Sequence, residues 1–219
     1  GLKGIAPGDD MLFAVFQMMF AIITPALITG AIVARFKFTT YLVFLVIWIT
    51  VVYAPIAHWV WAGNGWLLEM DALDFAGGTV VHINAAVAAV AAAILVGKRR
   101  SPGMEPANIP YVVIGASLLW FGWFGLNAGS ALGANDVAVS AFVATHIAAC
   151  AGGFSWMIVE WINQGKPTVL GVASGIISGL ATITPGAGFL GPLSALFVGL
   201  FAGAVCYIAV IWKTRLVYD

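Results

Sequence analysis

Long apolar stretches separated by short polar ones are the main feature of this sequence. Seven apolar runs can be drawn, each bounded by charged residues, glycine or proline. At a rise of about 1.5 Å per residue, each run is about long enough to cross a bilayer as a helix. None of them alternates residue by residue as a barrel strand would. The runs cover residues 11–34, 41–62, 75–97, 109–132, 137–162, 169–185 and 189–212.

The composition predicts the same class of protein. Of the 219 residues, 62% are hydrophobic and 8% are charged, whereas about 25% are charged in an average soluble domain. A soluble fold of this size must present a wettable outside and cannot hide so much apolar surface. We therefore predict an all-α, polytopic transmembrane helical bundle that forms one partial membrane domain over residues 1–219. We expect the bundle to be incomplete at both ends, since the chain opens without Met and stops abruptly at Asp219.

The distribution of charge predicts an orientation. Eight of the nine basic residues follow the first, third, fifth and seventh runs: Arg35, Lys37, Lys98, Arg99, Arg100, Lys166, Lys213 and Arg215. The opposite loops carry Glu69, Asp71, Asp74 and Asp136 instead. By the positive-inside rule, we expect a multi-pass protein of the cell membrane with cytoplasmic basic loops and an external N-terminal stretch, Gly1–Asp10.

Several other classes find no support in the composition. The net charge is zero, which gives no indication of a nucleic-acid partner. Cys150 and Cys206 lie inside apolar runs without a metal-binding spacing, so we expect no disulfide, metal or cofactor. Ser174, in Gly171-Val172-Ala173-Ser174-Gly175, resembles a hydrolase serine only superficially, because no histidine in the following run supplies a base. We therefore expect no enzyme.

His82 is the foremost polar residue at helix depth. It lies within the third run, more than one turn beyond Gly77. Because desolvation disfavours a charged imidazole there, the ring should be neutral, with one nitrogen that donates and one that accepts. The residues alone leave two interpretations open, a pore group that meets a small polar permeant and a core histidine bonded to a neighbouring helix.

Asp74 and a set of aromatic residues also have simple structural explanations. Asp74 directly precedes the third helix, where its carboxylate can accept hydrogen bonds from free backbone N–H groups, and we prefer this capping role to that of a cation ligand. The aromatic residues near the external ends of the runs are typical of an interfacial belt, although an aromatic face at a pore mouth can also hold a cation. They are Trp59, Trp61, Trp66, Trp120, Trp123 and Phe124.

Two further histidines and two glycine stripes are interpreted as packing features. His58 should be interfacial, and His146 should be hydrogen-bonded across helices. Gly171, Gly175 and Gly179 recur every four residues, as do Gly199 and Gly203, which favours close helix approach in lipid. The triplet Ile-Thr-Pro occurs twice, at residues 23–25 and 183–185, and such repeated breaks occur in inverted-repeat transporters.

Four stretches resemble one known family. Residues 74–86, DFAGGTVVHINAA, are similar to the long signature of the ammonium transporter family (Amt/Mep, related to the Rh proteins). Residues 16–27, 53–61 and 122–130 resemble other parts of the family in the same order. The resemblance covers essentially the whole chain and implies the third to ninth of the family's eleven helices.

The resemblance also implies roles for individual residues and an assembly. It implies a homotrimer with one pore per subunit and, as partners, the lipid bilayer, ammonium or ammonia, and a cytoplasmic regulatory protein or fused signalling domain. Trp61 and Ser130 match the residues that hold ammonium at the external mouth, and Phe20 matches one of two stacked phenylalanines that close it. Trp123 matches a pore-lining tryptophan, His82 the first of two pore histidines, and Asp74 an aspartate that organises the recruitment region.

Two departures from the family pattern affect this transfer. Leu126 stands where the family has its second gate phenylalanine, so a looser gate is expected. The second pore histidine belongs to the tenth helix of the family, beyond this chain, and His146 does not match it.

The functional prediction is ammonium transport, and two alternatives remain. Losing hydration in an apolar pore costs an ammonium ion several kcal/mol, whereas neutral ammonia crosses cheaply. Binding the ion outside, removing its proton and passing ammonia along a histidine-lined pore avoids much of this cost. The same fold can instead serve as an ammonium sensor (transceptor), which a signalling extension after Asp219 would favour. A pure gas or water channel is disfavoured by the cation-binding mouth.

Overall fold

The computed structural model describes residues 8–98, 106 and 108–215, and every secondary-structure element in this part of the chain is helical. Some of the predictions concern residues outside this part of the chain. They are those for the N-terminal stretch at residues 1–7, for the basic residues Arg99 and Arg100, for the side chain of Arg215, and for the end of the chain at residues 216–219. The elements are α1 (Asp9–Ile32), α2 (Phe38–Trp48), η1 (Ile49–Tyr53), α3 (Ala54–Trp61), α4 (Trp66–Glu69), η2 (Gly78–Ile83), α5 (Asn84–Val96), α6 (Ile109–Gly129), α7 (Asp136–Gln164), α8 (Val169–Ile183), η3 (Thr184–Gly186) and α9 (Pro192–Arg215).

Seven helical segments of the described residues are long and apolar enough to cross a membrane. They begin and end within a few residues of the apolar runs in most cases. Only the second differs more, because it continues to Glu69 through the short helix α4. The third begins at Gly78, after the bend that residues 75–77 form ahead of it. The spans are Asp10–Ile32, Phe38–Glu69, Gly78–Val96, Ile109–Gly129, Asp136–Gln164, Val169–Gly186 and Pro192–Lys213.

The second span contains a proline without being broken. Helices α2 and α3 are joined by η1, a π-helical segment, and Pro55 is the second residue of α3. Proline removes the N–H that would bond to the carbonyl four residues earlier, and the wider hydrogen-bonding pattern just before it accommodates that loss. The chain therefore stays helical across the membrane.

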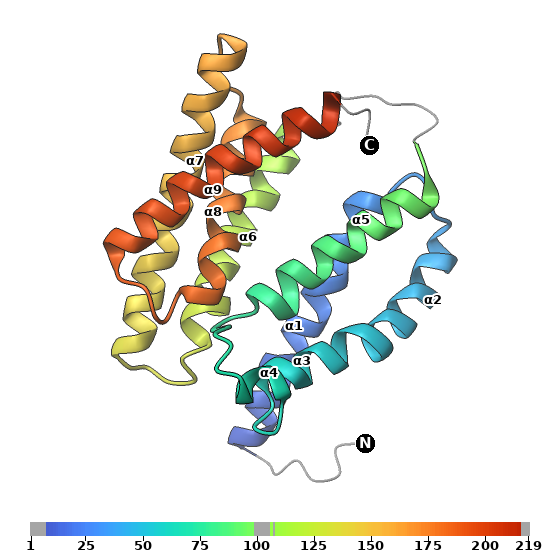
Figure 1. Cartoon of the computed structure of the whole chain (residues 1–219), viewed down its shortest axis with the longest axis vertical. Coiled ribbons are helices and arrows are strands. Elements are labelled where there is room, and N and C mark those ends of the chain that lie inside the picture. Colours follow the sequence, from blue (N-terminus) through green and yellow to red (C-terminus); the bar gives the residue numbers. More distant parts are fainter. Residues whose placement is uncertain (1–7, 99–105, 107, 216–219) are drawn as a thin grey trace. The chain divides into compact units, whose positions relative to one another are not determined.

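The helices belong to two compact units. The first unit comprises Gly1–Ala72 and Thr79–Arg99, and the second comprises Leu73–Gly78 and Arg100–Asp219. In the first unit α1 packs along α5 (Figure 1). The guanidinium of Arg35, just after α1, donates a hydrogen bond to the carbonyl oxygen of Gly97 at the end of α5, which joins the two helix ends on the basic side.

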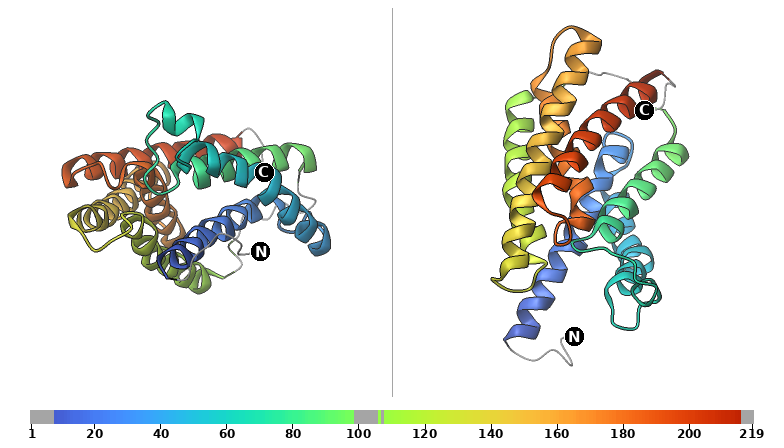
Figure 2. Two further views of the ribbon diagram at one scale, coloured as in Figure 1. Left: turned by 90° about the horizontal axis from the view of Figure 1, so that it is seen from below. Right: turned by 60° about the vertical axis from the view of Figure 1, so that its left-hand side comes forward.

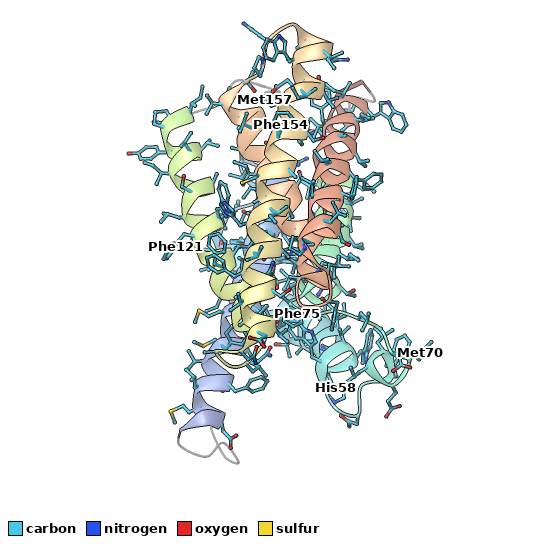
Figure 3. The ribbon with its side chains drawn as sticks, turned by 90° about the vertical axis from the view of Figure 1, so that its left-hand side faces the viewer. His58, Met70, Phe75, Phe121, Phe154 and Met157 are labelled. Atoms are coloured by element: carbon cyan, nitrogen blue, oxygen red, sulfur yellow. The ribbon has the colours of Figure 1, made fainter. Side chains whose placement is uncertain are left out.

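The second unit is built on α7, α8 and α9, which pack on one another, with α6 against α7 and α8 (Figures 1 and 2). The centre of this unit consists mainly of small side chains, and large apolar side chains point outward. Phe121 of α6, for example, is 78% exposed (Figure 3). This arrangement suits a lipid surround, in which close backbone approach drives helix association. The fully buried alanines include Ala141, Ala144, Ala148 and Ala195.

The glycine stripes lie at the closest helix contacts of this unit. A β-carbon at Gly179 of α8 or at Gly199 of α9 would collide with the backbone carbonyl of Ala148 in α7. A β-carbon at Gly175 or Gly203 would collide with the carbonyl of Gly152. The close packing expected from the spacing is therefore confirmed, and α7 is the helix onto which both stripes pack.

We predict that Gly203→Ala destabilises the protein. Because the obstacle is backbone rather than a flexible side chain, α9 must move away from α7, at a cost of about 1–3 kcal/mol. Gly115→Ala in α6 is the matched control, since a β-carbon there meets no atom within 4 Å. Thermal unfolding in detergent should show a lowered midpoint temperature for the Gly203→Ala variant. The midpoint of the control should not be lowered. Equal midpoints for the two variants would contradict the packing argument.

Candidate functional site

Three aromatic side chains of the first unit meet between α1 and α3. The Phe20 and Trp61 rings lie 5.2 Å apart between centroids, with their planes at 76°, so that they make an edge contact. Phe16 makes a similar contact with Phe20 at 5.0 Å. Phe20 is buried, at 2% exposure, while Trp61, the last residue of α3, remains partly exposed. Two of the residues that the resemblance assigns to the mouth, Phe20 and Trp61, therefore lie together.

The turn of α1 that carries Phe20 is fixed by the Thr-Pro pair one turn later. Pro25 lies inside α1 and donates no backbone hydrogen bond. The Thr24 hydroxyl donates to the carbonyl oxygen of Phe20 at 2.6 Å and is fully buried. Tyr41 of α2 donates its hydroxyl to the carbonyl oxygen of Pro25 at 3.3 Å. Side-chain hydrogen bonds thus support the backbone around the break.

His82 lies in the π-helical segment η2, directly before α5. Its side chain is partly buried, and the preceding residues, Val80 and Val81, are completely buried. Asn84 donates its side-chain amide to the carbonyl oxygen of Val80 at 3.1 Å. Single π turns inside helices are rare and occur often at functional positions, and here the turn carries the imidazole that the sequence analysis singled out.

Asp74 belongs to the second unit and has the capping role expected from its position. Its Oδ1 atom accepts hydrogen bonds from the backbone N–H groups of Gly77 at 2.8 Å and Gly78 at 2.5 Å. The side chain is buried, at 8% exposure. The neighbouring Phe75 donates its backbone N–H to the carbonyl oxygen of Pro185 at 3.0 Å. The carboxylate therefore serves backbone donors at the start of η2.

The remaining candidates follow one another on α6. Trp123, 3% exposed, donates its indole N–H to the Thr184 hydroxyl oxygen at 2.8 Å. Leu126 packs partly buried against the cluster that includes Trp123. Ser130 ends the helix and donates its hydroxyl to the carbonyl oxygen of Leu126 at 2.8 Å. Trp61 and Ser130, which the resemblance pairs, belong to different units.

One pair of completely buried polar residues was not predicted from the sequence. Asn127 of α6 and Thr145 of α7 are both completely buried, and the Asn127 amide donates to the Thr145 hydroxyl oxygen at 2.9 Å. The rule that selected His82, a polar residue at helix depth, also identifies these two. Thr184, which accepts the hydrogen bond from Trp123, was considered only as a member of the Ile-Thr-Pro triplet at residues 183–185.

His146 packs against a neighbouring helix as expected, but the expected hydrogen bond across helices was wrong. Its ring stacks on Trp120 of α6, with centroids 5.4 Å apart and planes at 25°, instead of forming a hydrogen bond across helices. Its Nε2 atom lies 3.8 Å from the Sγ atom of Cys150, one turn along the same helix. An aromatic imidazole face packs against an indole face as readily as a phenyl ring does, so the cross-helix contact is made by ring stacking.

Two other simple explanations agree with the structure. His58 is exposed (Figure 3) and directly precedes Trp59. The rings of Trp59 and Trp66 lie 6.0 Å apart between centroids, and both side chains are exposed, as in an interfacial belt. The Ser174 hydroxyl donates to the carbonyl oxygen of Leu170 in its own helix at 2.9 Å, which is ordinary back-bonding in an apolar helix.

These features define a class of protein: a multi-pass membrane protein whose helices carry buried hydroxyl, amide and indole groups and one partly buried imidazole at helix depth. The profile of the Ammonium Transporter Family matches residues 3–219. The chain belongs to the ammonium transporter family, which is a family of transporters and not of enzymes.

Individual relatives agree with this assignment. Ammonium transporter Amt1 of Archaeoglobus fulgidus is 51% identical over 98% of this chain and 55% of its own length. The crystal structure of Candida albicans Mep2 superposes with a TM-score of 0.91 at 41% identity, over 96% of this chain and 48% of that one. A solved structure titled Sensor Amt Protein superposes at 0.86 with 32% identity, over 93% and 54%. The chain thus spans about half the length of the curated relatives it matches.

We predict that Asp74→Ala lowers the free energy of unfolding by about 1 kcal/mol, the usual value of a lost cap. Asp74→Asn should retain most of the stability, because the amide oxygen can still accept from the same two backbone N–H groups. Chemical or thermal unfolding of the purified variants measures the difference. If the Asn variant were as unstable as the Ala variant, the charge rather than the capping geometry would explain the role of Asp74.

Proposed function

We propose that this chain is part of a protein that moves ammonium across a membrane by binding the ion at an external aromatic site, removing its proton and passing ammonia through an apolar pore. The observation that carries the proposal is the edge contact of Phe20 with Trp61 in a chain of this family. It leaves Trp61 partly exposed next to a fully buried phenyl ring, so the indole is held in one orientation at the boundary between wet and apolar surroundings.

Recruitment rests on Trp61 and Ser130. Ammonium carries four N–H donors and no acceptor, so a site for it must offer π faces or oxygen lone pairs. The Trp61 ring offers a face, worth up to about 2 kcal/mol when the cation is desolvated. The Ser130 hydroxyl donates its proton to the carbonyl oxygen of Leu126, so the Ser130 Oγ atom can accept a hydrogen bond from another group. We propose that the ion binds to these two groups.

Passage inward rests on Phe20, Trp123 and His82. Phe20 and Leu126 form the gate in this proposal, and a leucine leaves a softer closure than a second aromatic ring. Trp123 lines the pore in this proposal, and because its indole N–H donates to Thr184, the ring can present an apolar face. A neutral His82 can then accept or donate a hydrogen bond as ammonia passes.

The remaining parts of the proposal concern the surroundings of the pore. Asp74 holds the start of η2 and so organises the recruitment region without touching the ion. The basic loops are taken as cytoplasmic, from the positive-inside rule. We further propose a homotrimer with one pore in each subunit, as the family resemblance implies.

A second candidate function is ammonium sensing. It is supported by the similarity to the structure titled Sensor Amt Protein, although relatives named as transporters are more similar, at 51% against 32% identity. Both functions use the same binding groups. A catalytic or signalling extension after Asp219 would favour sensing.

We predict that Trp61→Leu raises the KM for ammonium by up to about 30-fold, the equivalent of the lost cation–π attraction. Trp61→Phe should fall between this variant and the unchanged protein, because phenylalanine keeps a weaker π face. Currents recorded against ammonium concentration in proteoliposomes of the whole protein measure the effect. Trp59→Leu is the control, since Trp59 contacts Trp66 and no proposed binding group. A KM unaffected by Trp61→Leu would refute the recruitment site.

We also predict that His82→Ala lowers the ammonium-dependent current by about a hundredfold or more, the usual loss when a proton-transfer group is removed. His58→Ala should leave the current intact, because that histidine is exposed at the interface. The two variants are compared in liposomes at equal protein content. An unchanged current with His82→Ala would count against a pore role and favour the interpretation of His82 as a core histidine.

A further inference from the structure

The orientation of the Asn127 side chain is determined by its surroundings. The Thr145 hydroxyl donates its proton to the carbonyl oxygen of Ala141 at 2.6 Å, so toward Asn127 it can only accept. The group of Asn127 that faces it must therefore be the NH₂ group, at 2.9 Å. Rotating the amide by half a turn would place two oxygens against each other without a proton between them. The amide oxygen is thus directed away from Thr145.

That oxygen is buried and has no hydrogen-bond partner among the described residues. The whole side chain is completely buried, and Oδ1 is one of a small number of buried polar atoms left without a partner. An amide oxygen has two lone pairs, and native proteins pair such groups with protein, water or a ligand, because an unmet one is costly. The oxygen is therefore suited to accept a hydrogen bond from a small donor.

The position on α6 indicates what the missing donor is. Asn127 lies four residues after Trp123 and three residues before Ser130, so the three side chains share one face of the helix. The other two carry the pore lining and the recruitment group in the proposed function. By contrast, the unpaired Nε1 atoms of Trp120 and Trp156 are donors and cannot serve ammonium, which itself only donates.

We propose that Asn127 is a further binding residue of the permeation path, whose Oδ1 atom accepts a hydrogen bond from a small N–H or O–H donor. The donor is either the permeating ammonium or ammonia, or an ordered water in line with it. This inference rests on the proposed function. It assigns Thr145 a positioning role, because the Thr145 hydroxyl fixes the direction of the acceptor.

The first test compares variants of the whole protein in proteoliposomes. Asn127→Leu has nearly the same shape and no acceptor, and it should lower ammonium transport by about tenfold, the value of one hydrogen bond to a charged or permeating donor. Thr145→Val releases the amide from its orientation and should cause a smaller loss. Thr182→Val is the matched control. The Thr182 hydroxyl also donates to a carbonyl oxygen one turn earlier, that of Ser178 at 2.8 Å, but the Thr182 side chain is exposed on α8.

The kinetic pattern distinguishes the two sources of the donor. A raised KM for ammonium in Asn127→Leu shows that the oxygen contacts the permeant. An unchanged KM with a reduced maximal current shows that it holds a water instead. Transport by a monodisperse Asn127→Leu protein that equals that of the unchanged protein in both KM and maximal current overturns the inference.

The second test needs no variant and so is independent of folding. A high-resolution experimental structure of the unchanged protein in ammonium should show density within hydrogen-bonding distance of Asn127 Oδ1. An empty site there overturns the inference. Failure of the unchanged protein to conduct ammonium refutes the proposed function itself, and density at Oδ1 would then still identify a bound donor.

Discussion

A polar group inside an apolar span must find its partner within the protein, and this constraint orders the interior of both units. Three threonines are completely buried: Thr24, Thr145 and Thr184. Each donates its hydroxyl proton to the carbonyl four residues earlier in its own chain segment. The donor is thereby satisfied locally, and the oxygen keeps lone pairs for another helix. Thr184 uses them for Trp123 and Thr145 for Asn127.

The same constraint explains why some glycines cannot be replaced. Glu160 of α7 is buried, and its carboxylate accepts from the backbone N–H of Thr168 at 3.0 Å and from its hydroxyl at 2.8 Å. The Thr168 hydroxyl oxygen in turn caps Gly171 at the start of α8. A β-carbon at Gly171 would occupy the space of the Glu160 carboxylate. A buried carboxyl group is tolerable only with such hydrogen bonds, so the glycine preserves the polar pairing as well as the close helix contact.

The parts of the structure that depend on local sequence could be predicted from it. Hydropathy located the spans because a helix must be apolar over about 20 residues to cross lipid, and the Asp74 cap followed from its place just before a helix. The π-helical segments were not predicted. They depend on how the backbone hydrogen bonds of the helix adjust around Pro55 and before Asn84, rather than on composition. The contact of His146 with Trp120 and the direction of the Asn127 amide depend on which side chain the neighbouring helix presents, and the pattern of a single helix does not contain that information.

The two Ile-Thr-Pro breaks connect these local rules to the proposed path. In α1, the Thr24 hydroxyl donates to the carbonyl oxygen of Phe20, so the break fixes the turn that carries the proposed gate ring. At the end of α8, Thr184 holds the indole of Trp123, while the carbonyl of the next residue, Pro185, accepts from Phe75. Gly78 lies so close to the Pro185 ring that no β-carbon fits between them, and Gly78 is the first residue of the helix segment that carries His82. At each break the threonine hydroxyl thus bonds a residue of the proposed path, and the proline carbonyl accepts a hydrogen bond from a neighbouring segment.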